Sequence, residues 1–259
     1  DVAKAIAIVG TRRATDYGKR IVEELIAVLA TYDDILIVSG LAYGIDIHVH
    51  KCCLQYRIPT VGVMGSGIDV VYPPTHRTVA QEMIKQGGGL LTEYKIGTSP
   101  DAPHFPERNR IIAGLVDVVV VVEAAQSGGA LITAEYANNY HREVAAFPGS
   151  VFHEFSEGCH QLIRLHKAHL ITKANDLIEL MNWNKKQTSS SPQPTRMPQH
   201  LSQDEQKIWL LLAEQPLHID ELSIRSHIPI HTLASILLAM ELNGWIQALP
   251  GKRFKLASL

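Results

Sequence analysis

Two arginines and an asparagine stand together at Arg108-Asn109-Arg110, and guanidinium groups recognise phosphate oxygens well. They follow Phe105-Pro106, where the proline favours extended backbone just before it, and they precede apolar residues at helical spacing. The pattern predicts a loop that runs into a helix, whose start presents unpaired N–H groups and a partial positive charge. The stretch 104–115 is therefore a candidate anion site. The alternative is that these arginines pair with carboxylates such as Glu107 on a solvated face.

Three other turns carry small residues in front of a helical pattern, where backbone N–H groups gather to bind anions. Gly10-Thr11-Arg12-Arg13 follows one apolar run, Ser39-Gly40 follows another, and Ser127-Gly128 opens a third helix. The first of these turns has arginines where the G-x-G-x-x-G fingerprint would place glycines, so a nicotinamide dinucleotide is not predicted. The residue types favour a phosphate-bearing ligand instead.

The other reactive side chains predict neither a metal site nor an enzyme. Three cysteines without a C-x-x-C pair argue against a disulfide framework or a zinc knuckle, and the 13 histidines are scattered. His48 and His50 would diverge on a helix, so no metal and no cofactor are predicted. Glu93, Glu123 and Glu135 are candidate acids or bases. Because no nucleophile–base pair is recognisable, we predict that the chain is not an enzyme.

Composition and charge set limits on these sites. The 259 residues are 46% hydrophobic and 19% charged, as in ordinary globular proteins, and the net charge is −2. Any phosphate site must therefore be a local basic patch. No apolar run approaches the roughly 20 residues of a membrane span, no signal peptide is recognisable, and a cytoplasmic location is predicted. Because the chain opens at Asp1 rather than Met, we expect a fragment of a longer protein.

Strands that alternate with helices must position the phosphate-binding turns. The predicted strands are the short apolar runs at 5–9, 35–38, 60–64, 90–92, 116–122 and 144–147. This alternation predicts an α/β fold with a Rossmann-like, doubly wound, mostly parallel sheet, whose ligands bind beyond the carboxyl ends of the strands. All of the candidate turns fall on that edge. Asp46 is predicted to cap the helix that carries His50, and helical and strand pieces at 162–170 and 177–181 close the domain.

The pattern changes after the predicted α/β domain, which spans residues 1–183. Residues 184–200 lose the apolar period and fill with Ser, Pro, Gln and Thr, which predicts a linker. Residues 201–259 then show three helical patterns and a hairpin, the order of a small C-terminal winged-helix domain. Its third helix, at 231–243, contains no Lys or Arg. Protein contact or regulation is therefore favoured at least as much as reading of a DNA groove.

Several of these motifs together resemble the DprA (Smf) family of DNA-processing proteins. The resemblance runs in the same order from about Ala3 to Ile171, and the winged-helix tail also suits the family. The residues that carry it are Gly10-Thr11-Arg12, Ser39-Gly40-Leu41-Ala42, Gly44-Ile45-Asp46, Phe105-Pro106, Arg108-Asn109-Arg110-Ile111-Ile112-Ala113-Gly114-Leu115, Ser127-Gly128 and Leu131-Ile132-Thr133-Ala134. Several motifs at matching spacing are more specific than any single one.

The resemblance implies a protein that binds and protects single-stranded DNA, forms a homodimer and loads the RecA recombinase during natural transformation, without being an enzyme. By resemblance, Arg12 contacts DNA, Phe105 is an aromatic residue beside the DNA, and Arg108–Arg110 borders the same pocket. The self-association surface would lie near Gly158–Ala168. The sequence departs from the family in two ways. The N-terminal helical domain of many members is missing, and His166-Lys167 stands where a glycine is commoner.

The residues and the resemblance combine into one hypothesis for the site. Phe105 would stack on an unpaired base, which tolerates any sequence and favours single strands because a duplex keeps its bases stacked internally. The alternative for Phe105 is a core position under the loop. The phosphates would be neutralised by Arg12, helped by Arg13 and Arg110, and by backbone N–H groups at Gly40 and Gly128.

Two rival functions follow from the same sequence. A related Rossmann-like group hydrolyses nucleoside monophosphates with a Pro-Gly-Gly-x-Gly-Thr loop and a glutamate. Residues 127–131 lack this signature, so a nucleotide-binding or nucleotide-hydrolysing enzyme is the weaker hypothesis. The second rival is a transcription regulator led by the winged helix, which the uncharged third helix disfavours.

Overall fold

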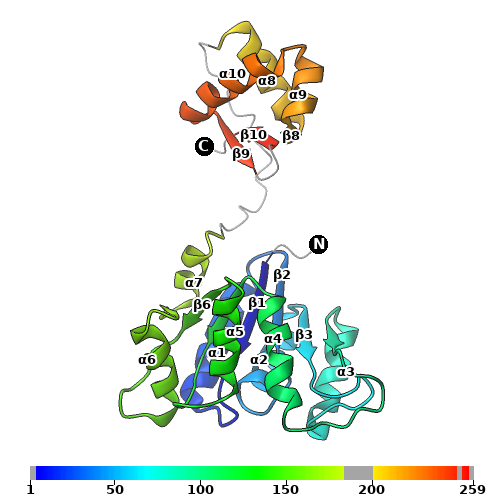
Figure 1. Cartoon of the computed structure of the whole chain (residues 1–259), viewed down its shortest axis with the longest axis vertical. Helices are drawn as coiled ribbons and strands as arrows, with labels where there is room; N and C mark the ends of the chain where they lie inside the picture. The colour runs from blue at the N-terminus through cyan, green and yellow to red at the C-terminus, as the bar shows by residue number, and fades with distance from the viewer. Residues whose placement is uncertain (1–3, 184–200, 250–252, 257–259) are drawn as a thin grey trace. The chain divides into compact units, whose positions relative to one another are not determined.

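The computed structural model of the chain describes residues 4–183, 201–249 and 253–256. The chain separates into two compact units, with the division between Lys186 and Gln187 (Figure 1). The predicted linker at 184–200 lies outside the described residues, and the limits of the two domains stay predictions.

The first unit is built on a seven-stranded sheet in which every neighbouring pair of strands is parallel. The strand order is β4-β3-β2-β1-β5-β6-β7. This arrangement confirms the Rossmann-like, doubly wound fold. The strands are β1 (Lys4–Val9), β2 (Ile35–Ser39), β3 (Thr60–Val63), β4 (Gly89–Leu91), β5 (Val118–Val121), β6 (Glu143–Ala146) and β7 (His169–Leu170).

Helices cover both faces of this sheet (Figure 1). Helices α1, α2 and α7 pack on one face, and α4, α5 and α6 pack on the other. The helices are α1 (Asp16–Leu29), α2 (Ile45–Tyr56), α3 (Arg77–Lys85), α4 (His104–Gly114), α5 (Gly129–Asn139), α6 (Glu157–Arg164) and α7 (Ala174–Leu180), with short 3₁₀ turns at Pro74–His76 and Glu154–Ser156.

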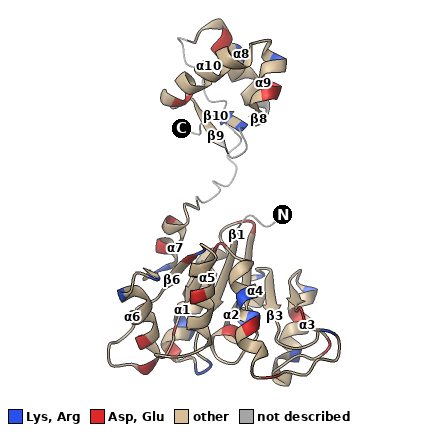
Figure 2. Ribbon diagram, in the orientation of Figure 1, with Lys and Arg blue, Asp and Glu red and all other residues tan. Residues whose placement is uncertain are grey.

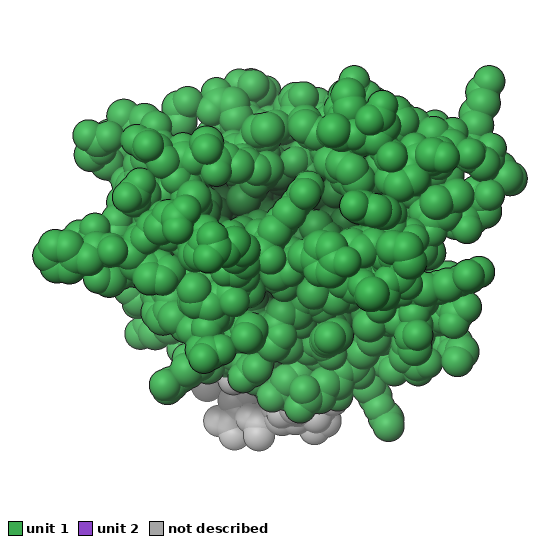
Figure 3. Space-filling view, turned by 90° about the horizontal axis from the view of Figure 1, so that it is seen from below, with its two compact units in different colours: residues 1–186 green, residues 187–259 purple. Residues whose placement is uncertain are grey.

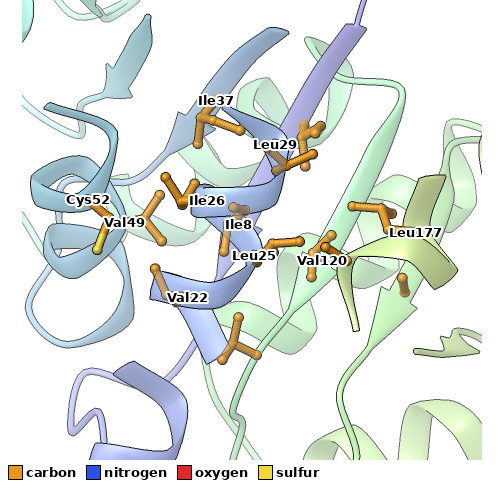
Figure 4. Close-up of a cluster of buried hydrophobic side chains, with 14 of the residues drawn as sticks. Ile8, Val22, Leu25, Ile26, Leu29, Ile37, Val49, Cys52, Val120 and Leu177 are labelled. Carbon is orange, nitrogen blue, oxygen red and sulfur yellow. The ribbon is translucent and has the colours of Figure 1, made fainter. Parts of the chain in front are cut away.

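The two central strands supply both halves of the core. Side chains alternate between the faces of a strand, so successive apolar residues enter opposite layers. Ile6 and Ile8 of β1 pack with α1 and α2, as Figure 4 shows for Ile8, whereas Ala7 and Val9 pack against the other layer. All four side chains are buried. The unbroken apolar runs in the sequence therefore correspond to strands that are buried on both faces.

The strand order reverses between β1 and β5. The chain passes from β1 outward to β4 on one side, then returns through α4 to β5 on the other. Doubly wound sheets bind their ligands at such a reversal, outside the carboxyl ends of the strands. The residues that follow β1 and β5 are therefore placed to form a site.

Three local predictions from the sequence are wrong. Helix α4 begins at His104, before the arginines, because a proline in the first turn of a helix loses no intrahelical hydrogen bond. Asp46 does not cap α2: Gly44 occupies that position, and Asp46 lies inside the first turn. Residues 177–181 are not a strand. They belong mostly to α7, where the Asp176 carboxylate accepts the N–H group of Thr172 at 2.8 Å, and β7 precedes that helix.

The second unit has its own apolar core and confirms the predicted winged helix. It contains α8 (Gln203–Glu214), β8 (Leu217–His218), α9 (Ile219–Ser226), α10 (Ile230–Leu242), β9 (Ile246–Leu249) and β10 (Arg253–Leu256). The strands form an antiparallel sheet in the order β8-β10-β9. Residues 250–252, the predicted hairpin turn, lie outside the described residues. Among the helices that the structure describes, none is long and apolar enough to cross a membrane.

A buried histidine makes the stability of the first unit depend on pH. His50 Nδ1 lies 2.8 Å from the Thr60 hydroxyl, and Nε2 has no protein hydrogen-bond partner. Burial, with His76 and Arg108 nearby, lowers the pKa of His50 to about 3. The folded chain therefore resists protonation of a side chain that the unfolded chain protonates below about pH 6.5.

We predict that this histidine destabilises the fold in acid. Its contribution to stability is fully present above about pH 6.5 and is lost as the pH falls toward about 3, by roughly 1.4 kcal/mol per pH unit. Urea denaturation of wild type and His50→Gln at pH 7, 6, 5 and 4 measures this loss. The wild-type free energy of unfolding should fall more steeply than that of His50→Gln. Parallel pH profiles would contradict the assignment.

Candidate nucleic-acid interface

A pocket of about 830 Å³ opens beyond the carboxyl ends of β1 and β5. Figure 3 shows the first unit from this side, where the surface is hollowed. The walls come from the turn after β1, the start of α4, the segment after β5 and the start of α5. Those elements meet at the reversal of strand order, as the fold requires. Of the predicted site residues, the pocket brings together Gly10, Thr11, Arg12, Arg13, Phe105, Arg108, Asn109, Ser127 and Gly128.

The exposed positive charge of the pocket comes from the turn after β1. Arg12 and Arg13 are both exposed. The guanidinium carbon of Arg12 lies 5.6 Å from the ring centre of Phe105, and that of Arg13 lies 5.4 Å from the ring centre of Phe155. Stacking on rings orients the guanidinium groups and leaves their N–H groups free to bind phosphate.

A close backbone contact with α2 shapes this turn. The N–H group of Ile45 donates to the Thr11 carbonyl at 3.1 Å, and the neighbouring Gly44 has a φ of 79°. A Cβ atom on Gly44 would lie 2.1 Å from the Thr11 carbonyl oxygen. Because only glycine combines this conformation with this approach, Gly44 fixes the path of the Arg12 turn. This role was absent from the sequence interpretation, although Gly44 stands in one of the motifs.

An aromatic surface continues from the arginine turn. Phe105, in the first turn of α4, is half-buried, and its ring centre lies 5.7 Å from that of Tyr72. A second recess of about 320 Å³ lies beside these two rings and shares Arg12 with the main pocket. Half-burial makes Phe105 neither a core residue nor a free side chain. It presents a partly exposed ring face next to a guanidinium group.

The start of α5 brings backbone N–H groups to the opposite wall. Helix α5 begins after Gly128 without a side-chain cap, and the residues of its first turn line the pocket, so no capping side chain takes their N–H groups. Asn109 holds this wall in place because its Nδ2 donates to the Gly129 carbonyl at 3.1 Å. Ser127 and Gly128 are exposed at the rim. The predicted second nest for phosphate oxygens thus lines the same pocket as Arg12.

Arg108 has a structural position, in contrast to the exposed arginines. Its side chain is buried, and one terminal nitrogen donates to the carbonyl of Gly40 at 2.8 Å and to the carbonyl of Val63. Its Nε donates to Asn109 Oδ1 at 3.2 Å. The Asp46 carboxylate accepts the N–H group of Gly40 at 3.1 Å. The guanidinium group therefore ties the ends of β2 and β3 to α4.

Burial affects both charges of this network. Burial lowers the pKa of Arg108 to about 10, and Asp46 opposes that effect. Burial also raises the pKa of Asp46, against the positive charge of Arg108 and the N–H groups of Ala42 and Gly40. Each residue thus stabilises the charged form of the other in a region with little water. Removal of either would leave a buried charge without compensation.

Three of the predicted phosphate ligands are not available in the structure. Arg110 lies outside the pocket wall and donates to both carboxylate oxygens of Glu93, at 2.6 Å for Oε2. The N–H group of Gly40 is taken by Asp46. Ser39 is buried and donates to the Ile8 carbonyl at 2.7 Å. Their spacing in the sequence reflects support of the loops rather than contact with a ligand.

The candidate acid and base groups are engaged as well. Glu93 pairs with Arg110, and Glu135 lies 2.7 Å from Lys167. Glu123 is buried and accepts the N–H group of Thr15 at 3.0 Å. Figure 2 shows basic and acidic residues interspersed on the ribbon, in keeping with a local basic patch rather than a basic molecule. Tyr72 and Phe155 line the two recesses but were missed by the sequence analysis, because no motif in the sequence contains either residue.

The fold defines a two-unit protein with a Rossmann-like domain, which carries the candidate pocket, and a winged-helix domain. The sequence profile for DNA recombination-mediator protein A matches residues 1–182, and that for the DprA winged helix domain matches residues 192–252. The chain therefore belongs to the DNA recombination-mediator protein A (DprA, or Smf) family, which confirms the resemblance.

Relatives and solved structures agree with this assignment. The chain is 33% identical to Protein Smf of Synechocystis over 96% of the chain and 69% of that protein. The X-ray structure of DprA from Streptococcus pneumoniae has a TM-score of 0.62 at 40% identity, over 68% of this chain and 61% of that one. DprA of Helicobacter pylori, described by its single-stranded DNA binding mode, has a TM-score of 0.63 at 30% identity, over 70% and 81%. The chain spans about two thirds of its curated relatives.

The neighbouring arginines of α4 allow a matched test of the structural network. We predict that Arg108→Met destabilises the first unit by about 3–5 kcal/mol, because two carbonyl groups and the Asp46 carboxylate lose a buried partner. Arg110→Met should cost at most about 1 kcal/mol, since its ion pair with Glu93 is solvent-exposed. Urea denaturation of both variants measures the difference. Equal losses would contradict the distinction between the two arginines.

Proposed function

We propose that this chain binds single-stranded DNA without sequence specificity in the pocket beyond β1 and β5. The single observation that carries the proposal is the stacking of the exposed Arg12 guanidinium group against the half-buried ring of Phe105, at 5.6 Å. A cation beside an aromatic face suits a nucleotide, whose phosphate and base lie next to each other. The single-stranded DNA binding mode described for the Helicobacter pylori relative supports the same ligand class.

The two walls of the pocket divide the work of binding. Arg12 and Arg13 neutralise phosphate charges on one side, and the first N–H groups of α5 donate hydrogen bonds to phosphate oxygens on the other. Phe105, with Tyr72 beside it, stacks on an unpaired base, which is worth roughly 1–3 kcal/mol for each base. A duplex keeps its bases stacked internally and gains no such contact. Single strands are therefore preferred, and no base edge is read.

We infer that the chain acts by binding and protecting the strand rather than as an enzyme. The engagement of Glu93, Glu123 and Glu135 with other side or main chains supports this inference. Following the family, the protein would load the RecA recombinase on the bound strand during natural transformation, in the cytoplasm. Helix α10 of the winged helix has no Lys or Arg and exposes Ile230, Leu238 and Leu242, so we assign this domain to protein contact.

We predict that Arg12→Ala weakens binding of a fluorescent oligo-dT by about tenfold or more, because one charge-assisted contact to phosphate is lost. The slope of log K against log salt should fall by about 0.7 for each contact removed. Fluorescence anisotropy over a salt series, with a duplex of equal length alongside, measures both quantities. Wild type should prefer the single strand.

Arg20→Ala is the matched control, because Arg20 is an exposed arginine of α1 that pairs with Glu24. It should leave both affinity and salt slope unchanged. Phe105→Leu should keep the salt slope but reduce the preference for single strands over duplex. The proposal fails if Arg12→Ala equals Arg20→Ala, or if wild type binds neither DNA above background. Release of free base from a nucleoside monophosphate would instead favour the enzymatic alternative.

We further propose that two copies associate through the region of residues 158–168. Helix α6 ends there, Leu165 is 50% exposed, and the adjoining β7 is the edge strand of the sheet, with Leu170 also exposed. His166 has a left-handed φ of 55°, the conformation that glycine adopts most easily, which accounts for the commoner residue at this turn. Two pockets on one strand would raise the apparent affinity through effective concentration.

Leu165→Asp should dissociate the dimer, because a charge would be desolvated in the contact. We expect sedimentation equilibrium to show at least about tenfold weaker self-association, with weaker binding of long oligo-dT but unchanged binding of a strand too short to bridge two pockets. Ile84→Asp, on the exposed side of α3 at 55% exposure, is the matched control. A wild-type monomer, or equal behaviour of the two variants, would refute the proposed surface.

A further inference from the structure

Three side chains that bind metals in proteins converge between α1 and α2. Glu23 comes from α1, and His48 and Cys52, four residues apart, share one face of α2. One donor atom of each lies within 4.8 Å of the others. Figure 4 shows Cys52 next to Val49 on α2, across from Val22 and Ile26 of α1. None of the three lines the pocket described above.

The two distances that His48 Nε2 makes to the other donor atoms match edges of a zinc tetrahedron. His48 Nε2 lies 3.2 Å from Glu23 Oε1 and 3.6 Å from Cys52 Sγ. Bonds of about 2.0 Å to nitrogen and oxygen and about 2.3 Å to sulfur give tetrahedral edges of about 3.3 Å for N–O and about 3.5 Å for S–N. These two contacts would scarcely change around an ion.

Hydrogen bonding within the cluster leaves one of the two contacts weak. Both are made by the same atom, His48 Nε2, which in neutral imidazole has either one hydrogen or one lone pair. With a lone pair it cannot bind the Glu23 carboxylate, and with a hydrogen it must share that hydrogen between the carboxylate and the Cys52 sulfur, a weak acceptor. A metal ion accepts an electron pair from all three donors at once.

We propose that Glu23, His48 and Cys52 form a zinc-binding site that clamps α1 to α2. On binding, the S–H bond of Cys52 breaks, its proton leaves to solvent, and the thiolate pair forms the bond to Zn²⁺; His48 donates its Nε2 lone pair, and Glu23 donates a carboxylate oxygen. The thiolate and carboxylate charges balance the ion. Three protein ligands leave a fourth position for water.

The partial exposure of the cluster agrees with a metal site. The Glu23 side chain is 56% exposed and that of His48 is 21% exposed, which gives an ion a path from solvent.

The proposed zinc site would support the Arg12 turn through the two helices that adjoin it. Helix α1 follows the Arg12 turn, and α2 begins at Gly44, whose neighbour Ile45 donates to the Thr11 carbonyl. His48 lies in the first turns of α2, close to that contact in the chain. A metal that joins the two helices would hold them at a fixed separation and so support the turn. The site itself does not depend on what the pocket binds.

Cobalt substitution tests the site with a signal that only a thiolate ligand gives. The full chain is stripped with a chelator and titrated with Co²⁺. We expect one equivalent to produce a near-ultraviolet sulfur-to-cobalt charge-transfer band and visible bands of four-coordinate cobalt, both removed by Zn²⁺. Zn²⁺ should also raise the melting temperature.

Cys52→Ser should abolish the charge-transfer band and weaken the metal at least about 100-fold, since loss of outer-shell partners already costs about 10–100-fold. Cys53→Ser is the matched control: Cys53 is the adjacent buried cysteine outside the cluster, and its variant should behave as wild type. His48→Gln is a second variant. Because His48 is partly exposed, this substitution should disturb folding less. A charge-transfer band that persists in Cys52→Ser, or the absence of the band in wild type, would overturn the proposed site. The metal would then be bound by scattered histidines or not bound at all.

Discussion

The buried Arg108 guanidinium group is the interaction on which the rest of the site depends. A parallel sheet leaves carbonyl groups unpaired at the carboxyl ends of its strands, and here those of Gly40 and Val63 are turned inward, away from water. Unpaired buried carbonyls are costly, and one arginine with several N–H donors satisfies two of them. Asp46 balances its charge and fixes Gly40 as well. The edge that carries the candidate pocket is thus closed underneath by a polar network.

This network explains why arginines close together in the motif have different roles. Arg108 faces inward, and Arg110, two residues later on α4, turns away to Glu93. The helix places them about 200° apart, so they cannot serve one pocket together. The free positive charge must come from another element, and the turn after β1 supplies it with Arg12 and Arg13. A small, exposed basic patch lies above the network of Arg108 and Asp46, whose charges balance. Such a patch suits a ligand that is held by the charge of its phosphate backbone.

The sequence predicted the fold well because its strongest signals are local. Unbroken apolar runs and glycine turns predicted the central strands and the edge that carries the loops. The direction of a side chain on a helix whose start was misplaced by four residues could not be predicted, so Arg110 was wrongly assigned to the pocket, and the burial of Arg108 in the pocket wall was not foreseen. The roles of Gly44, Tyr72 and Phe155 depend on contacts between distant segments. Such contacts leave no periodic pattern in a single sequence. The contact of Glu23 with His48 across two helices was missed for the same reason.

The two helices next to the arginine turn show how support and binding are combined. Helix α1 is capped by Thr15, whose hydroxyl donates to the buried Glu123 at 2.5 Å, and α2 begins at a glycine pressed against the Thr11 carbonyl. The turn between these anchors therefore has little freedom in its backbone, whereas the arginine side chains remain exposed. A rigid backbone lowers the entropy lost on binding. Under the proposed function, the exposed guanidinium groups on that backbone would contact phosphates, which are the same in every sequence, and lack of sequence specificity would follow.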